Sequence, residues 1–127
     1  AIGSGVVASL LAAGACVYAT DVDEARLAVA MARCNAGPGH LATGVHDITD
    51  AAQVAAMFDD CAGTFGGVDV VVPNAGIAHV SRLDRMDAER FAKVMAVNTT
   101  GTLHVLKEAA RVLRAQRTGG SVVVQAS

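Results

Sequence analysis

Residues 68–76 of the chain read Val-Asp-Val-Val-Val-Pro-Asn-Ala-Gly. The valine-rich half predicts a buried strand over 68–72, because a single aspartate interrupts the apolar run. This strand leads into Asn74, Ala75 and Gly76, which form a small polar corner at its carboxyl end. In open α/β sheets ligands bind at such corners, where a glycine lets a ligand approach the backbone closely. These residues therefore predict a ligand site, and the alternative interpretation is an ordinary turn.

Helices and strands alternate along the rest of the chain. Further strands are predicted at 16–20, 41–45 and 122–124, and helices at 3–13, 23–34, 50–65 and 88–116. Gly101 lies inside the longest helix and predicts a bend there. The apolar face of this helix, which includes Phe91, Met95 and Leu103, is expected to pack in the core or against a second subunit. Short valine-rich strands between longer helices predict an α/β fold with a parallel sheet covered on both faces.

The composition excludes several classes of protein. The chain has 127 residues, which suits one domain, and a net charge of −2 without clustered basic residues, so nucleic-acid binding is not expected. No apolar run approaches the roughly 18–20 residues that span a membrane. The four histidines lack the spacing of metal ligands, so no metal site is expected.

The cysteines favour a reducing compartment. Cys16, Cys34 and Cys61 are odd in number and include no Cys-x-x-Cys pair, so each is expected to be a reduced core thiol. No basic segment precedes the apolar residues 6–13, so a signal peptide is not indicated. Together these features favour the cytoplasm.

Two residues near the start of the chain have the spacing of a dinucleotide site. Gly3 opens the first predicted helix, where backbone N–H groups and the helix dipole favour a pyrophosphate. Asp21 ends the next strand, 18 residues later, and can accept hydrogen bonds from an adenosine ribose. A plain helix start followed by a strand-end aspartate is the alternative.

Three further polar residues lie near predicted element ends. Asp47 follows the strand 41–45 and could meet an adenine amino group. Its alternative role is to cap the next helix, although Asp50, with Gln53 completing a capping box, fits that role better. Asn98 lies inside the long helix and needs partners if it is buried. Ser127 follows the last strand, on the ligand side of the sheet.

In combination these residues resemble the short-chain dehydrogenase/reductase family. The resemblance runs from residue 1 to residue 127 and is strongest at residues 74–76, at Asn98 and in the approach of residues 120–124 to Ser127. It implies an incomplete, Rossmann-like doubly wound sheet with three layers, in one partial nucleotide-binding domain over residues 1–127.

The resemblance also implies roles for individual residues. Cofactor binding falls to the following positions: Ile2, Gly3, Asp21, Asp47, Ile48, Asn74, Ala75 and Gly76. Asn98 matches the catalytic asparagine, whose backbone carbonyl holds a water of the family's proton relay. Ser127 matches the catalytic serine, which hydrogen-bonds the substrate oxygen. Ala1 stands where the family usually has a glycine, and Pro73 replaces a commoner asparagine.

Two parts of the family pattern are expected outside residues 1–127. The first strand and most of the glycine loop should precede Ala1, and a Tyr-x-x-x-Lys pair should follow Ser127. The tyrosine is the family's general base, so this chain by itself is expected to be inactive. The only tyrosine present, Tyr18, has no lysine four residues later and is expected to be structural. Because the missing strand is central in the order 3-2-1-4-5-6, the four predicted strands should form two separate pairs.

The implied activity is hydride transfer between NAD and the carbinol or carbonyl carbon of a small-molecule alcohol or carbonyl substrate, in a protein that is a homo-oligomer when complete. NAD is expected rather than NADP, because Asp21 repels a 2′-phosphate and the nearest basic residue, Arg26, is expected inside the next helix. A non-catalytic Rossmann-type binding or regulatory module is the alternative. A narrower variant is the dehydrogenase domain of a fused sugar-phosphate aldolase/dehydrogenase, which the segment 112–127 resembles.

Overall fold

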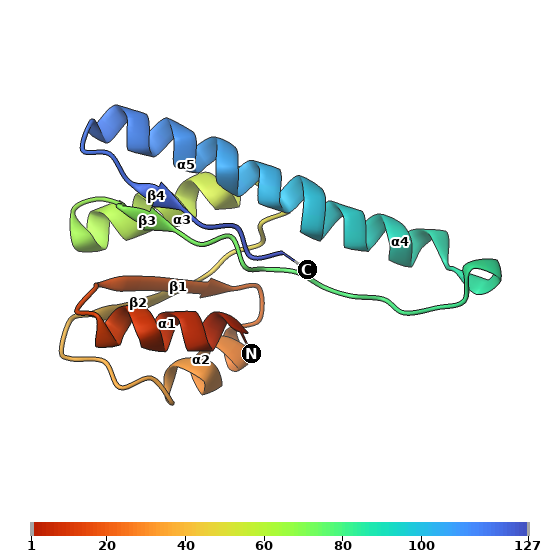
Figure 1. The fold of residues 1–127 in the computed structure, drawn as a ribbon, viewed down its shortest axis with the longest axis horizontal. Coiled ribbons are helices and arrows are strands. Elements are labelled where there is room, and N and C mark those ends of the chain that lie inside the picture. The colour runs from red at the N-terminus through yellow and green to blue at the C-terminus, as the bar shows by residue number, and fades with distance from the viewer. Residues whose placement is uncertain (1, 127) are drawn as a thin grey trace.

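The computed structural model describes residues 2–126, in which helices and strands alternate as the sequence predicts (Figure 1). The helices are α1 (Ile2–Ala12), α2 (Glu24–Met31), α3 (Ala51–Phe65), α4 (Ala88–Met95) and α5 (Thr102–Gln116), with a 3-10 turn η1 (Leu83–Arg85) and a π-helical segment η2 (Ala96–Gly101). The strands are β1 (Val17–Asp21), β2 (Leu41–Val45), β3 (Val70–Val71) and β4 (Ser121–Val122). β3 and β4 are shorter than the predicted strands 68–72 and 122–124.

The strands form two parallel pairs. β1 pairs with β2, and β3 pairs with β4. The second pairing continues past the formal ends of its strands, because Ser121 N donates to Asp69 O at 2.9 Å and Gln125 N donates to Pro73 O at 3.0 Å. No strand within residues 2–126 joins the two pairs. The predicted pairing is therefore confirmed, and the described residues form an incomplete Rossmann fold.

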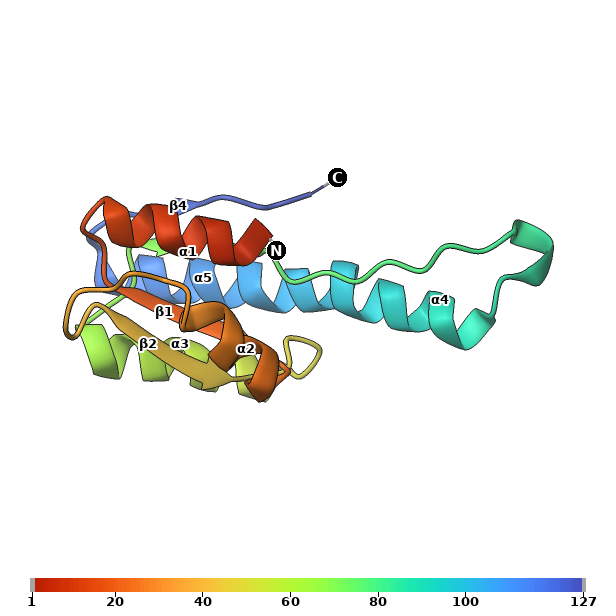
Figure 2. The ribbon, with the colours of Figure 1, turned by 90° about the horizontal axis from the view of Figure 1, so that it is seen from below.

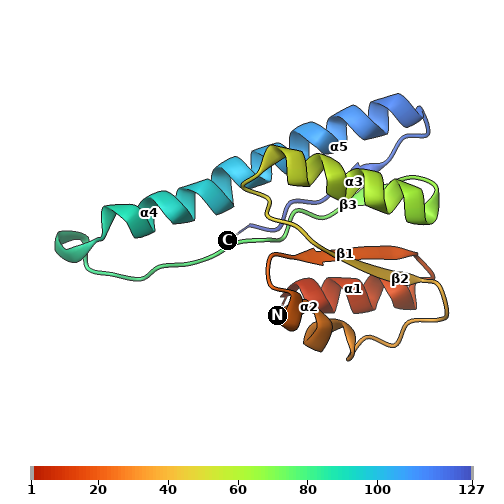
Figure 3. The same ribbon diagram turned by 180° about the vertical axis from the view of Figure 1, so that it is seen from behind.

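Helices cover both faces of the β1–β2 sheet (Figure 3). Alternate residues of β1 point to opposite sides: Val17 and Ala19 pack with Leu11 of α1 and Leu27 of α2. Thr20 lies on the other side, where its hydroxyl is 3.4 Å from Met57 Sδ of α3. A second core cluster lies between α3, α5 and β3: Val54, Phe58, Val68, Val71, Val105 and Ala109. The alternation places the sheet in the middle of three layers.

Capping residues begin and end the helices. The Asp50 carboxylate accepts hydrogen bonds from Ala52 N and Gln53 N and caps α3, as predicted. Asp87 caps α4 in the same way. Gly66 ends α3 with a φ of 88°, a left-handed conformation that glycine adopts without strain.

The long helix differs from its prediction. α4, η2 and α5 form one continuous rod that extends, with the loop before α4, well beyond the sheets (Figure 2). Gly101 is buried, and a Cβ atom there would lie 2.7 Å from the side chain of Ile48, so close packing of this side chain against the helix explains the glycine. Phe91, Met95 and Leu103 are exposed, which corrects their prediction as core residues and leaves the subunit-contact alternative.

The prediction for the cysteines is wrong at one position. Cys34 and Cys61 are partly buried against the two core clusters, whereas Cys16 is exposed at the turn before β1. Within residues 2–126, no helix is long and apolar enough to cross a membrane. The same residues contain no group of three or more His, Cys, Asp or Glu side chains that could hold a metal ion.

Candidate functional site

Gly3 at the start of α1 lies against Asn74, which follows β3. A Cβ atom at Gly3 would lie 2.7 Å from Asn74 Nδ2, so any other residue there would displace the asparagine. These two residues belong to elements on opposite sides of the gap between the strand pairs (Figure 1). The fold thus brings the helix start and the Asn-Ala-Gly corner together at the carboxyl edge of the strands, where a nucleotide is expected.

Asp21, at the end of β1, keeps part of its carboxylate accessible. Its Oδ1 accepts a hydrogen bond from Asp23 N at 3.0 Å, and its side chain is 33% exposed. Arg26 lies inside α2, as predicted, but its Nη2 reaches to 3.7 Å from Asp21 Oδ2. The prediction that no basic group lies near Asp21 is therefore wrong: one helical turn brings Arg26 back over the strand end.

Asp47 forms a turn and does not cap α3. Its Oδ1 accepts hydrogen bonds from both the backbone N and the hydroxyl of Thr49, each at 2.8 Å. The capping box also differs from its prediction, because Gln53 Oε1 accepts from Asp47 N at 2.9 Å while Gln53 Nε2 donates to the Asp50 carboxylate. The hydrogen bond from the Gln53 side chain, with those from the backbone, lowers the pKa of Asp50. The turn thus fixes Asp47 two residues after the end of β2.

Ile48 is held by a residue that the sequence analysis did not single out. His104 Nδ1 of α5 lies 3.0 Å from the Ile48 carbonyl oxygen, and Ile48 packs against Gly101 one turn earlier in the same helix. The spacing of three residues between Gly101 and His104 places both on one helix face, and this is the signal that could have indicated the contact.

Asn98 fixes the loop that follows the Asn-Ala-Gly corner. Its Nδ2 donates to Ile77 O and its Oδ1 accepts from Ile77 N, each at 2.9 Å. The residue lies in η2, and π-helical turns occur frequently at functional sites. The side-chain amide of Asn98 is thus engaged in holding the loop.

Ala75 and Gly76 are exposed, and a Cβ atom at Gly76 would make only ordinary contact, 3.5 Å from Asn98 Oδ1. Among the described residues, no atom lies close enough to position 76 to require a glycine there. Ser127 and Ala1 lie outside the described residues. β4 runs parallel to β3 toward the same edge.

The comparisons with known proteins decide the family. The model of the short chain dehydrogenase family matches residues 1–127. The chain belongs to the short-chain dehydrogenase family. It is 32% identical over 126 residues to galactitol 2-dehydrogenase of Agrobacterium fabrum, covering 99% of this chain and 48% of that protein. It is 37% identical over 116 residues to short chain dehydrogenase/reductase dpchG of Colletotrichum higginsianum, covering 87% of this chain and 41% of that protein.

Solved structures agree. A short-chain dehydrogenase/reductase of Mycobacterium marinum superposes with a TM-score of 0.90 at 31% identity, over 99% of this chain and 51% of that one. The chain thus spans about half the length of the relatives that it matches. These relatives are named as dehydrogenases or reductases, which makes the family one of oxidoreductases.

Tyr18 of this short-chain dehydrogenase chain is unsuited to act as a base. Its hydroxyl lies 3.4 Å from Asp60 Oδ2, on the side of β1 that faces α3. Burial, and then the charge of Asp60, raise the pKa of Tyr18 above its ordinary value of 10.0, whereas a general base near neutral pH needs a lowered one. Its expected structural role fits this geometry.

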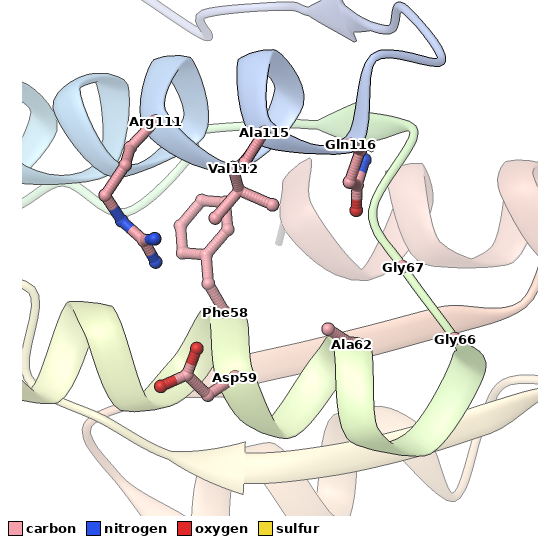
Figure 4. A pocket seen from close by; sticks show the side chains of 9 residues that line it. All are labelled: Phe58, Asp59, Ala62, Gly66, Gly67, Arg111, Val112, Ala115 and Gln116. Atoms are coloured by element: carbon pink, nitrogen blue, oxygen red, sulfur yellow. The ribbon is translucent and has the colours of Figure 1, made fainter.

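Among the hollows that the described residues of this short-chain dehydrogenase chain form, two differ in size and place. The larger, about 330 Å³, lies between α3 and the end of α5 and is lined by Phe58, Arg111 and Gln116 among others (Figure 4). Gln116 holds the backbone of Val68 at the start of the β3 strand run, so this hollow lies at the edge opposite the candidate site. The smaller, about 250 Å³, adjoins Ile77 and is lined in part by His79, Arg90 and Lys93.

Proposed function

We propose that this chain is one partial nucleotide-binding domain of an NAD-dependent oxidoreductase. The observation that carries the proposal is the meeting of Gly3 and Asn74 across the two strand pairs, at the edge where Asp21 ends β1 and Asp47 follows β2. Membership of the short-chain dehydrogenase family supports the same activity.

The residues present suit a nicotinamide dinucleotide. The start of α1 at Ile2 and Gly3 offers backbone N–H groups to a pyrophosphate, and the lack of a side chain at Gly3 leaves room for the Asn74 side chain. Asp21 would accept the ribose hydroxyls. The segment Asp47–Ile48 would line the adenine, and residues 74–76 would flank the cofactor on the other side. When bound, NAD supplies a nicotinamide carbon that accepts or returns a hydride.

The proposed chemistry oxidises a carbinol carbon to a carbonyl. The carbon loses a hydride with its two electrons, and the hydroxyl loses a proton to a base. Ser127 would hydrogen-bond the substrate oxygen, and the Asn98 backbone carbonyl would hold a water on the proton's path. Tyr18 faces Asp60 and is unsuited to receive that proton. We propose as the base the tyrosine of the Tyr-x-x-x-Lys pair that the family resemblance implies.

The finer features follow from the same residues. Galactitol 2-dehydrogenase, by its name, acts on a sugar alcohol, which supports a small secondary alcohol or the matching carbonyl compound as substrate. The fused aldolase/dehydrogenase variant stays a prediction from segment 112–127.

The exposed apolar side chains of Phe91, Met95 and Leu103 support assembly with a second copy through the long helix. The three free cysteines of the described residues support a reducing cytoplasm.

The experiment uses the full-length protein. Binding of NAD is measured by calorimetry, and NADH formation is followed with galactitol and other secondary alcohols. Binding with turnover is the expected result. Binding without turnover of any alcohol or carbonyl compound would favour the non-catalytic module, and absence of binding would refute the proposal.

A further inference from the structure

His46 is a buried histidine that the proposed chemistry does not use. It directly follows β2, and its side chain is only 9% exposed. Its Nε2 lies 3.2 Å from Asp60 Oδ2 of α3, and its ring is 6.3 Å from that of Tyr18. Of the two side chains beside the His46 ring, Asp60 carries a charge and Tyr18 is titratable.

The backbone at Gly44 makes room for this imidazole. A Cβ atom at Gly44 would lie 2.6 Å from His46 Cε1 and would also collide with the Tyr18 hydroxyl. β2 therefore has a glycine at the position that the His46 ring covers. Such a fit indicates that the ring's position against α3 is specified, since a glycine inside a strand otherwise weakens it.

The hydrogen bonds favour one form of the ring. Nδ1 is buried and has no hydrogen-bond partner, whereas Nε2 faces a carboxylate. A bare nitrogen costs less when unpartnered than an N–H group would, so the hydrogen bonding favours a proton on Nε2, where it faces Asp60. In this form the side chain donates one hydrogen bond, to Asp60.

The backbone of His46 links the two aspartate residues that the proposed function assigns to the adenosine. Its backbone N donates to Asp21 O at 3.2 Å, and Asp47 is its immediate neighbour. On the far side of Asp47, the Ile48 carbonyl is held by His104. The segment 46–48 is thus tied to β1, to α3 and to α5. Its links to α3 are the contact of the His46 ring with Asp60, the hydrogen bond from Asp47 N to Gln53 Oε1, and the packing of Ile48 against the core cluster of Val54 and Phe58.

We propose that His46 is a positioning residue for nucleotide binding: through Asp60 it fixes the segment Asp47–Ile48 relative to Asp21 and so sets the affinity for the adenosine end of the cofactor. The inference rests on the proposed function. It assigns the histidine no contact with the nucleotide.

The test measures the dissociation constants of AMP and NAD for the full-length protein. His46→Leu removes the hydrogen bond at similar volume and is expected to weaken AMP binding about tenfold. His46→Gln, which can still donate to Asp60, is expected to recover most of the affinity, and a role in packing alone would not produce this rescue. His40→Leu makes the same chemical change at an exposed position just before β2 and should bind AMP as the wild type does.

Asp60→Asn is the second variant, chosen because its side chain is 56% exposed and the substitution leaves the core intact. This variant weakens the His46–Asp60 hydrogen bond by changing Asp60 and should raise the AMP dissociation constant severalfold. If His46→Leu does not fold, the result with Asp60→Asn decides the test. If His46→Leu folds and binds AMP with wild-type affinity, the inference about His46 is overturned and the proposed function stands. If His46→Leu does not fold, wild-type affinity of Asp60→Asn has the same consequence. A wild-type protein that binds neither AMP nor NAD would overturn the proposed function as well.

Discussion

Replacing Asp21 should shift the cofactor preference from NAD toward NADP. A 2′-phosphate carries close to two negative charges, and a carboxylate about 4 Å from one unit charge costs about 4 kcal/mol at an effective dielectric constant of about 20. The Asp21 side chain is 33% exposed, so solvent and salt reduce this severalfold, to about 1–3 kcal/mol. The wild-type protein should therefore favour NAD by about ten- to a hundredfold in kcat/KM.

Arg26 reduces this preference without cancelling it. Its side chain is 74% exposed and 3.7 Å from Asp21, a geometry worth less than about 1 kcal/mol. In Asp21→Ala the freed guanidinium can face the phosphate, so kcat/KM with NADP should rise. In the double variant with Arg26→Ala only the part of that gain that the guanidinium supplies should disappear, and the part from the lost repulsion should remain.

The assay is the ratio of kcat/KM with the two cofactors in the full-length protein. Asp21→Ala should lower the NAD:NADP ratio about tenfold or more. Glu24→Ala removes an equal charge from an exposed position at the start of α2 and should leave the ratio nearly unchanged. A wild-type ratio that favours NADP, or a ratio that Asp21→Ala does not move, would refute the role of Asp21.

Three further predictions follow from single side chains. Asn98→Ala removes both bonds to the loop, each worth about 0.5–1.5 kcal/mol, and should lower kcat/KM at least tenfold in steady-state assays while the protein stays folded. Gly101→Ala should lower the free energy of unfolding by about 1–3 kcal/mol, whereas Gly63→Ala, with nothing within 4 Å, should raise it by about 0.5–1 kcal/mol; equal denaturation midpoints would contradict this. Tyr18 should form tyrosinate, followed by ultraviolet absorbance, only above its ordinary pKa of 10.0, and Asp60→Asn should lower that midpoint. Because the folded state holds this proton more tightly, its contribution to stability is present below pH 10 and is lost as the pH rises through the raised pKa.

Local patterns in the sequence were sufficient for the order of elements and for the family. The valine run before Asn74 predicts a buried parallel strand, because period and composition are local properties of a few residues. The cap at Asp50 could be predicted for the same reason, since a capping side chain acts within one helical turn.

Long-range packing decided the features that were mispredicted or missed. In the sequence no basic residue stands beside Asp21, and only the helical turn of α2 brings the Arg26 side chain close to its carboxylate. In the sequence Gly101 predicts a bend in the helix. In the structure the glycine makes room for Ile48, which lies more than fifty residues earlier in the chain. The burial of Phe91 and Leu103 could not be settled by helical period alone, because an apolar face is the same whether it meets a core, a second subunit or water.

The sequence by itself determined which residues are present at each strand end, and hence the kind of ligand that this edge suits. Only the tertiary structure decided how those residues are held: Asn98 by Ile77, Ile48 by His104 and His46 by Asp60. The physical reason is that each of these contacts joins residues 14 to 56 positions apart. Their distances depend on how helices pack against the sheet, which no local pattern of residues records.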